Sequence, residues 1–170
     1  MIWVDNDATP RAVLEVLFRA ARKRQVPVML VANRWSEHPK SRYIGSVVVA
    51  AGADVADDYI VEHCDDGHLV VTADIPLAAR AVERGATVIN PRGRTLTDAD
   101  VREALSMRDF HQELRDSGVE TGGPRPFNQS DLQSFANSLD RWMSRRTPEL
   151  VAAHAEGISG AAAGRVEGSG

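Results

Sequence analysis

Short apolar runs alternate with longer amphipathic segments over the N-terminal half of the chain. The runs are rich in valine and isoleucine and too short for typical helices, so they are expected to form buried β-strands. Strands that alternate with helices at this spacing favour right-handed β-α-β crossovers. The pattern therefore predicts an α/β fold with a mostly parallel five-stranded sheet and helices on both faces. The predicted strands cover residues 2–4, 27–32, 46–50, 68–72 and 87–89.

The segments between these strands carry the features of helix starts. Thr9 and Pro10 are expected to be the cap and the first residue of one helix, and Asp54 and Asp74 can cap two more. From Thr97 onward the pattern predicts helices alone, the last of them amphipathic. We expect these C-terminal helices to pack across the sheet or against a second copy of the chain, which would make the protein a homo-oligomer.

The composition predicts one domain and a tail. A chain of 170 residues, 43% of them hydrophobic, can bury one sizeable core but is too short for two ordinary domains. Its last residues are rich in alanine, glycine and serine, with few large apolar side chains to offset the entropy lost on ordering. We therefore expect a domain over residues 1–146 and a flexible tail over residues 147–170.

Charge and cysteine content narrow the classes of function. The formal net charge of -4 argues against a generally basic nucleic-acid coat, but leaves room for a local basic rim around an acidic site. The lone cysteine, Cys64, can form no internal disulfide, which fits a reducing compartment. No apolar run is long enough to cross a bilayer. A soluble, cytoplasmic protein without a membrane partner is expected.

Aspartates follow three of the predicted strands. In an open parallel sheet, ligands bind outside the carboxyl ends of the strands, so these side chains should meet at one edge. Carboxylates gathered there repel one another unless a cation offsets them. Hard oxygen ligands without a histidine or cysteine cluster favour Mg²⁺ or Mn²⁺, which would support phosphodiester hydrolysis. The candidate metal ligands are Asp5 and Asp7 after the first strand, Asp54, Asp57 and Asp58 after the third, and Asp74 after the fourth.

Structural roles compete with this interpretation. Asp74 and Asp54 can simply cap helices, and Asp58 sits where a helix dipole favours negative charge. Asp5 differs from them because it directly follows a buried strand and precedes the expected cap. It is the strongest functional candidate of the set.

Two loops, residues 33–42 and 90–94, are expected at the same edge. Their cationic side chains could contact phosphates, and Trp35 could stack on a base. Ordinary solvated loop charge is the competing interpretation. The candidate substrate-binding residues are Asn33, Arg42, Thr72, Asn90, Arg92 and Arg94.

Ordered motifs run along most of the chain. They are IWVDNDATP from residue 2, VAN from 31, AAGADVAD from 50, TADIPLA from 72, NPRG from 90, MRDF from 107 and TGGP from 121. This series resembles the bacterial YaiI/YqxD family, itself uncharacterised, over roughly residues 1–146. Family members commonly have cysteine where this chain has Thr9, so a thiol-based role at that position does not carry over.

The resemblance implies a fold similar to PIN-like domains. In PIN-like nucleases, acidic residues after the first, third and fourth strands hold metal, which implies Asp5, Asp57 and Asp74 as the catalytic set here. Asp7, Asp54 and Asp58 are further candidates. Thr72-Ala73-Asp74 matches the Thr-x-Asp element of those nucleases.

Three functions are consistent with these residues. The first is a Mg²⁺- or Mn²⁺-dependent PIN-like nuclease acting on RNA, and the second is a non-catalytic RNA- or protein-binding module. The third is a phosphatase similar to the haloacid dehalogenases, with Asp5 as nucleophile and Asp7 as acid/base in the pattern Asp5-x-Asp7-x-Thr9. The phosphatase is disfavoured because no lysine follows Thr72.

Overall fold

A computed structural model describes residues 1–118 and 125–145. The tail predicted over residues 147–170 and the TGGP motif of residues 121–124 lie outside the described residues. Within the described ranges, no helix is both long enough and apolar enough to cross a membrane.

The sheet has the order β3-β2-β1-β4-β5-β6. The first five strands are parallel, which confirms the mostly parallel sheet predicted from the sequence, and β6 joins the edge in antiparallel orientation. The strands are β1 (Ile2–Asp5), β2 (Val28–Ala32), β3 (Ile44–Val48), β4 (Leu69–Val71), β5 (Thr87–Ile89) and β6 (Thr95–Leu96).

Two strands differ from the prediction. β3 begins two residues earlier than expected, because its register places Ile44 beside Val28 of β2. It is an edge strand in which only Ile44 is buried, so its apolar residues mark its ends poorly. β6 has only two residues and was not predicted; its pairing with β5 depends on the intervening turn rather than on an apolar run.

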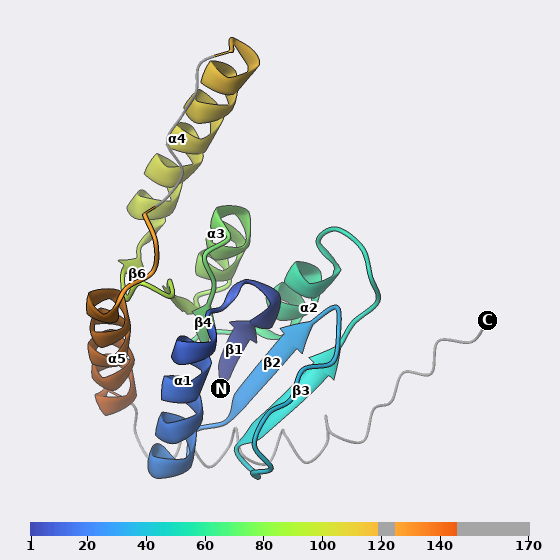
Figure 1. The fold of residues 1–170 in the computed structure, drawn as a ribbon, viewed down its shortest axis with the longest axis vertical. Helices are drawn as coiled ribbons and strands as arrows, with labels where there is room; N and C mark the ends of the chain where they lie inside the picture. The colour runs from blue at the N-terminus through green and yellow to red at the C-terminus, as the bar shows by residue number, and fades with distance from the viewer. Residues whose placement is uncertain (119–124, 146–170) are drawn as a thin grey trace, which may run out of the picture.

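Helices cover both faces of the sheet (Figure 1). α1 and α5 pack on one face, where Phe18, Phe135 and Leu139 meet the side chains of β1 and β2. α2 and α3 pack on the other face, where Ile60 and Leu77 share a second core cluster. The helices are α1 (Arg11–Arg24), α2 (Val55–His63), α3 (Ile75–Glu83), α4 (Asp98–Asp116) and α5 (Gln129–Ser144), with a 3₁₀ turn, η1 (Asn6–Ala8), after β1.

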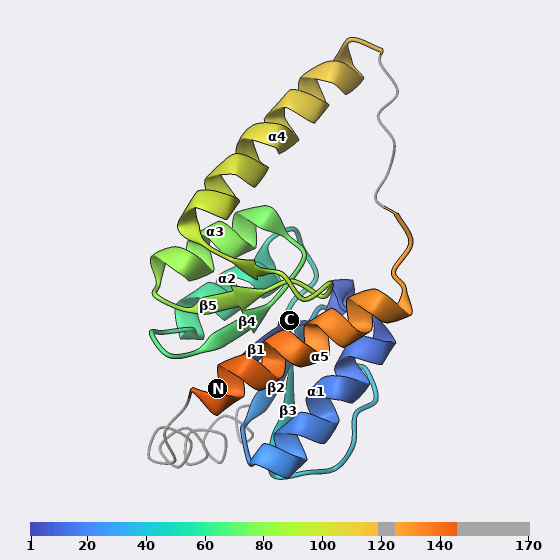
Figure 2. The ribbon, with the colours of Figure 1, turned by 90° about the vertical axis from the view of Figure 1, so that its left-hand side faces the viewer.

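The two C-terminal helices behave differently. α5 lies beside α1 on the sheet, whereas α4 projects away from the body of the molecule (Figure 2). Val101 is the buried residue of α4, and Met107 and Phe110 are about half exposed. α5 thus packs on the sheet as predicted, whereas most of α4 does not. The alternative prediction for α4, packing against a second copy of the chain, stays a prediction.

Of the three helix caps predicted from the sequence, the structure confirms one. Asp74 caps α3 by accepting a hydrogen bond from the Leu77 backbone N–H (2.8 Å). Asp54 occupies the N-cap position of α2, but its left-handed backbone (φ 65°) comes without a side-chain capping bond. Thr9 does not cap α1 either: Pro10 is the N-cap residue, and the Thr9 hydroxyl donates instead to the Asp5 backbone carbonyl (2.6 Å).

Gly93 sets how closely α5 approaches the sheet. It has a positive φ of 90°, and a Cβ at this position would overlap the backbone of Ser134 and Phe135 in α5. The Ser138 hydroxyl donates to the Gly93 carbonyl from the same helix. The glycine therefore satisfies both a left-handed turn and a close contact between backbones.

Candidate functional site

The order of the strands marks one position on the carboxyl edge of the sheet. From β1 the chain continues outward through β2 to β3, and then returns to β4 on the other side of β1. The boundary between β1 and β4 is thus the point at which strand order reverses, where open α/β sheets bind their ligands. Asp5 ends β1, and Thr72 directly follows β4.

Hydrogen bonds join the ends of these two strands. The Thr72 hydroxyl donates to Oδ2 of Asp5 (3.0 Å) and accepts from the backbone N–H of Asp74 (3.0 Å). Thr72 is fully buried, and Asp5 is only 7% exposed. The carboxylate of Asp5 is therefore fixed in a largely water-excluded position at the centre of the sheet.

Burial and like charges act together on the aspartates of this edge. Burial raises the pKa of Asp5; the Thr72 hydrogen bond opposes the rise, and the nearby charges of Asp74 and Asp7 add to it. The pKa of Asp57 is raised to about 6, first by burial and then by Asp74, Asp5 and Asp54, while Arg80 opposes the rise. Segments after β1, β3 and β4 thus bring their carboxylates close enough to repel one another.

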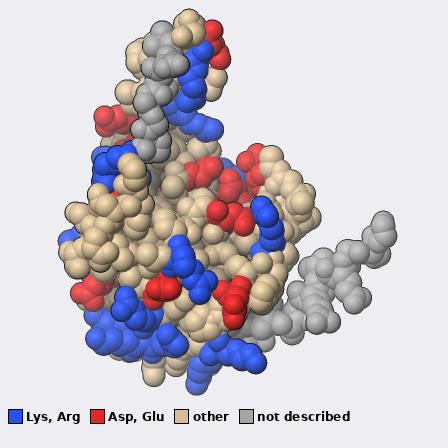
Figure 3. All heavy atoms as spheres, viewed as in Figure 1, with Lys and Arg blue, Asp and Glu red and all other residues tan. Residues whose placement is uncertain are grey.

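The acidic side chains form a visible group on the surface. Figure 3 shows them gathered over the carboxyl edge, near α2 and α3. Asp58 points to Arg80 and forms an ion pair with it (2.8 Å). Asp54 is exposed at the start of α2. These two residues therefore lie at the periphery of the group, while Asp5, Asp57 and Asp74 interact electrostatically at its centre.

The turn after β1 connects the acidic group to the next loop. Oδ2 of Asp7 accepts a hydrogen bond from the Asn33 backbone N–H (2.9 Å), and the side-chain amide of Asn6 donates to Ser36 (2.7 Å). Oδ1 of Asn6 is buried and, within the described ranges, has no hydrogen-bond partner. Asn6 was not among the candidates predicted from the sequence, although its position between Asp5 and Asp7 could have marked it.

Asp5, Asp57 and Asp74 offer the hard oxygen donors that Mg²⁺ and Mn²⁺ prefer. One oxygen of Asp74 caps α3 and one oxygen of Asp5 accepts from Thr72. The second oxygen of each carboxylate has no hydrogen bond to another described residue. In the described part of the chain, no three histidine, cysteine or acidic side chains already converge in a metal-binding arrangement. The donor chemistry fits a divalent ion, but the side chains as they lie do not form a complete ligand set.

The loop of residues 33–42 divides between the two edges of the sheet. Asn33 lies at the carboxyl edge beside Asp7, and Trp35 nearby is 70% exposed. Arg42 precedes β3 at the amino edge, where its guanidinium lies 5.3 Å from the centroid of the Tyr43 ring. The expectation that Arg42 borders the acidic site is wrong, because a loop between two parallel strands must return along their full length.

The loop of residues 90–94 is held by its own side chains. Oδ1 of Asn90 accepts from the backbone N–H groups of Arg92 (3.1 Å) and Arg94 (3.0 Å). Arg92 pairs with the buried Asp131 of α5 (2.9 Å), and Arg94 pairs with Asp100 of α4 (2.6 Å). Arg92 thus contributes to the docking of α5 through a contact between residues 39 positions apart, whereas Arg94 holds the start of α4 through a contact between residues six positions apart.

A small pocket adjoins the acidic group. It has a volume of about 210 Å³, and its walls include Ala8 of η1, Ala73 beside Asp74, and Asn90. Phe127, which precedes α5, contributes an aromatic side chain, and Arg92 lines the pocket as well. Phe127 was not singled out from the sequence, since its position depends on the packing of α5.

The family assignment follows from the chain as a whole. The fold and the site define the class of this protein: it is an α/β domain with a group of acidic side chains at the carboxyl edge of its sheet. The family described as "Uncharacterized BCR, YaiI/YqxD family" matches residues 3–145, so the chain belongs to the YaiI/YqxD family, as its motifs predicted.

Curated relatives agree with this assignment. A UPF0178 protein of Shewanella sp. (strain MR-7) is 55% identical over 144 residues, which cover 85% of this chain and 95% of that protein. The UPF0178 protein YaiI of Escherichia coli (strain ATCC 8739) is 55% identical over 141 residues, covering 83% of this chain and 92% of that protein. A UPF0178 protein of Shewanella baltica (strain OS155) is 54% identical over 144 residues, covering 85% and 96%. No solved structure matches the chain.

Proposed function

We propose that the chain is a nuclease that depends on Mg²⁺ or Mn²⁺ and cleaves RNA, with Asp5, Asp57 and Asp74 as its metal ligands. The observation that carries this proposal is the position of Asp5. A carboxylate that is 7% exposed lies at the point where strand order reverses. Burial raises its pKa, and the charge of Asp74, which follows another strand, adds to the rise. Burial also raises the pKa of Asp57, and there Asp74 and Asp5 both add to the rise.

Charge balance supports a bound cation. The basic side chain that opposes the raised pKa of Asp57 is Arg80, and Arg80 also pairs with Asp58. From the described residues, the carboxylate of Asp5 receives a side-chain hydrogen bond only from the neutral hydroxyl of Thr72. Repulsion among the carboxylates is therefore only partly offset by the protein, and a divalent ion would offset the remainder.

The residues around the acidic group have complementary tasks in this proposal. When bound, the ion would activate water and stabilise charge on a phosphoryl oxygen. Thr72 orients Asp5, and the cap at α3 fixes Asp74. Trp35 and Phe127 supply aromatic faces on which bases of a single strand can stack, and Asn90 lines the pocket next to the acidic group.

Cleavage of single-stranded RNA tests this proposal. The full chain is incubated with an end-labelled RNA oligonucleotide in chelator and in millimolar-scale Mn²⁺, and we expect Mn²⁺-dependent internucleotide cleavage. Asp5→Asn should reduce the rate by at least about a hundredfold, since it removes a ligand of the ion. Asp109→Asn is the matched control, because it removes the same charge from the exposed surface of α4 and should leave the rate unchanged.

The same assay separates the alternatives. A binding module would retain RNA in Mn²⁺ without cleaving it. A phosphatase would release inorganic phosphate and form an acyl phosphate at Asp5. The structure disfavours that chemistry, because Lys23 lies in the last turn of α1 and Lys40 just before the bridge at Ser41, both toward the amino edge. RNA retained but uncleaved in Mn²⁺ would refute the nuclease proposal.

A further inference from the structure

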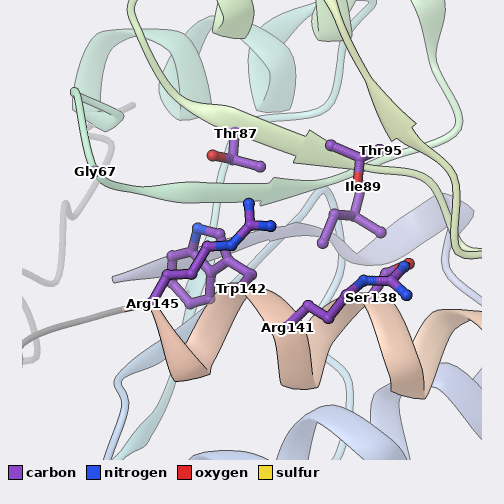
Figure 4. Close-up of a pocket in the computed structure, with 8 residues that line it drawn as sticks. All are labelled: Gly67, Thr87, Ile89, Thr95, Ser138, Arg141, Trp142 and Arg145. Atoms are coloured by element: carbon purple, nitrogen blue, oxygen red, sulfur yellow. The ribbon is translucent and has the colours of Figure 1, made fainter.

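A second pocket lies on the opposite face of β5 from α3, between the strands and the flank of α5 (Figure 4). Its volume is about 430 Å³, which lies within the range of small-molecule sites. Thr87 and Ile89 of β5 and Thr95 of β6 form one wall. This pocket shares no lining residue with the smaller one beside the acidic group.

The other wall is a single face of α5. Arg141 and Trp142 follow Ser138 by three and four residues, and the C-cap residue Arg145 follows them by four and three, so these side chains lie along one stripe at the end of the helix. Figure 4 shows the guanidinium of Arg145 directed from the helix toward the strands, with Trp142 beside it and Arg141 near Ser138. Two cationic groups and an aromatic ring therefore border the same space.

Among the described residues, no carboxylate neutralises the charges of this wall. Arg141 donates a hydrogen bond to the Ser138 hydroxyl (3.0 Å), but over residues 1–118 and 125–145 neither Arg141 nor Arg145 pairs with a carboxylate. Arg92, Arg94 and Arg125, by contrast, each pair with an aspartate. Two guanidinium groups thus lie on one rim without a carboxylate partner in the described ranges, and their planar donors match the geometry of a phosphate.

Other groups favour a nucleotide over a simple anion. In the part of the chain that the structure describes, the hydroxyls of Thr87 and Thr95 make no hydrogen bond, so both are available to ribose or phosphate oxygens. Ile89 and the indole of Trp142 give the pocket an apolar surface for a planar ring.

We propose that this pocket binds a mononucleotide, with Arg141 and Arg145 holding the phosphate and Trp142 and Ile89 contacting the base. The site is independent of the acidic group, so it stands whether or not the chain cleaves RNA.

Calorimetric titration of the full chain in chelator tests the site, with AMP, adenosine and inorganic phosphate as probes. AMP should bind more tightly than either adenosine or phosphate. Adenosine lacks the phosphate that the two arginines would hold, and inorganic phosphate lacks the base that the apolar wall would contact. Arg141→Ala combined with Arg145→Ala should weaken AMP binding by at least about tenfold, as expected for loss of charged hydrogen bonds. Arg19→Ala, an exposed arginine of α1, is the matched control and should bind AMP as the parent does.

Asp5→Asn separates this site from the acidic one and should leave AMP binding unchanged. Thermal melts of the arginine variants establish that they fold, since both side chains are exposed. Absence of AMP binding at millimolar concentration, equal affinity for adenosine and AMP, or unchanged AMP affinity in the double arginine variant would each overturn the proposal.

Discussion

The Thr72 hydroxyl donates a hydrogen bond to the Asp5 carboxylate at 3.0 Å, across the boundary between β1 and β4. The same hydroxyl accepts from the Asp74 backbone N–H, so one buried oxygen connects the ends of two strands and the start of α3. This arrangement couples the stability of the sheet centre to the ionisation of Asp5, because the hydrogen bond favours the charged carboxylate.

Thr72→Val should therefore destabilise the fold. Valine has a similar shape but removes the donor to Asp5 and the acceptor for Asp74, and lost hydrogen bonds to charged groups cost about 1.5–3 kcal/mol. Urea denaturation at neutral pH in chelator measures the change. Thr72→Ser keeps the hydroxyl and should recover most of the loss; equal destabilisation by serine and valine would point to packing instead.

Stability in chelator should fall as pH rises from about 4 to above 6. The pKa of Asp57 is raised from 3.8 to about 6 in the folded protein, so the folded state binds more protons than the unfolded chain in this window. The stability linked to Asp57 is fully present below pH 4 and lost as pH rises through 6. Solvent screening limits the effect to about 1–2 kcal/mol.

Urea denaturation of the parent and Asp57→Asn between pH 4.5 and 7.5 checks this slope, and the variant should show a flatter one. Asp100 and Asp131 act in the opposite sense, because their hydrogen bonds lower each pKa to about 2. Their contribution is lost only as pH falls from about 4 toward 2, outside the measured window. Identical slopes for the parent and the variant would show that the pKa of Asp57 is not raised in the folded protein.

Manganese should raise the melting temperature of the parent but not of Asp5→Asn. An ion that binds only the folded state stabilises it by mass action, and the variant removes one ligand. In chelator, Asp5→Asn should be at least as stable as the parent, because a repulsion among carboxylates is relieved. A parent protein whose melting temperature is insensitive to manganese would contradict the metal site.

Asp74→Asn tests whether Asp74 is more than a cap. Asparagine caps a helix nearly as well as aspartate, so a residue with a purely structural role would tolerate this change in chelator and in manganese alike. A metal ligand would tolerate it in chelator but lose the manganese-dependent rise in melting temperature. Thermal melts under the two conditions separate these roles.

Arg92→Ala should lower the melting temperature by several degrees. Arg92 reaches the buried Asp131 of α5 and also donates to the Arg125 carbonyl, so its loss loosens the docking of that helix. Arg34→Ala is a matched control at the carboxyl edge, where its side chain is exposed, and should leave the melting temperature unchanged. The same two variants locate the residues that bind RNA phosphates. If Arg34→Ala weakens RNA binding and flattens its salt dependence, the phosphate contacts lie in the loop of residues 33–42. Arg92→Ala should then weaken RNA binding only as far as it unfolds the protein.

The local part of the fold could be predicted from the sequence. The apolar runs of β1 and β2 follow from patterns within a few residues, and the strand-following aspartates follow from the rule for parallel sheets. The position of Arg42 could not be predicted in this way, because it depends on where a long loop ends. The ion pair of Arg92 joins residues 39 positions apart, and no local pattern encodes such a contact.

The projection of α4 gives the molecule an elongated outline. A helix of 19 residues spans roughly 28 Å at 1.5 Å per residue, which is comparable to the width of a small domain. Friction in water depends on outline as well as mass, so an 18.5 kDa chain with this arm should sediment more slowly and tumble more anisotropically than a sphere of equal mass. If two copies paired along Met107 and Phe110, each α4 helix would cover part of the other. The pairing would then change the frictional ratio measured by sedimentation.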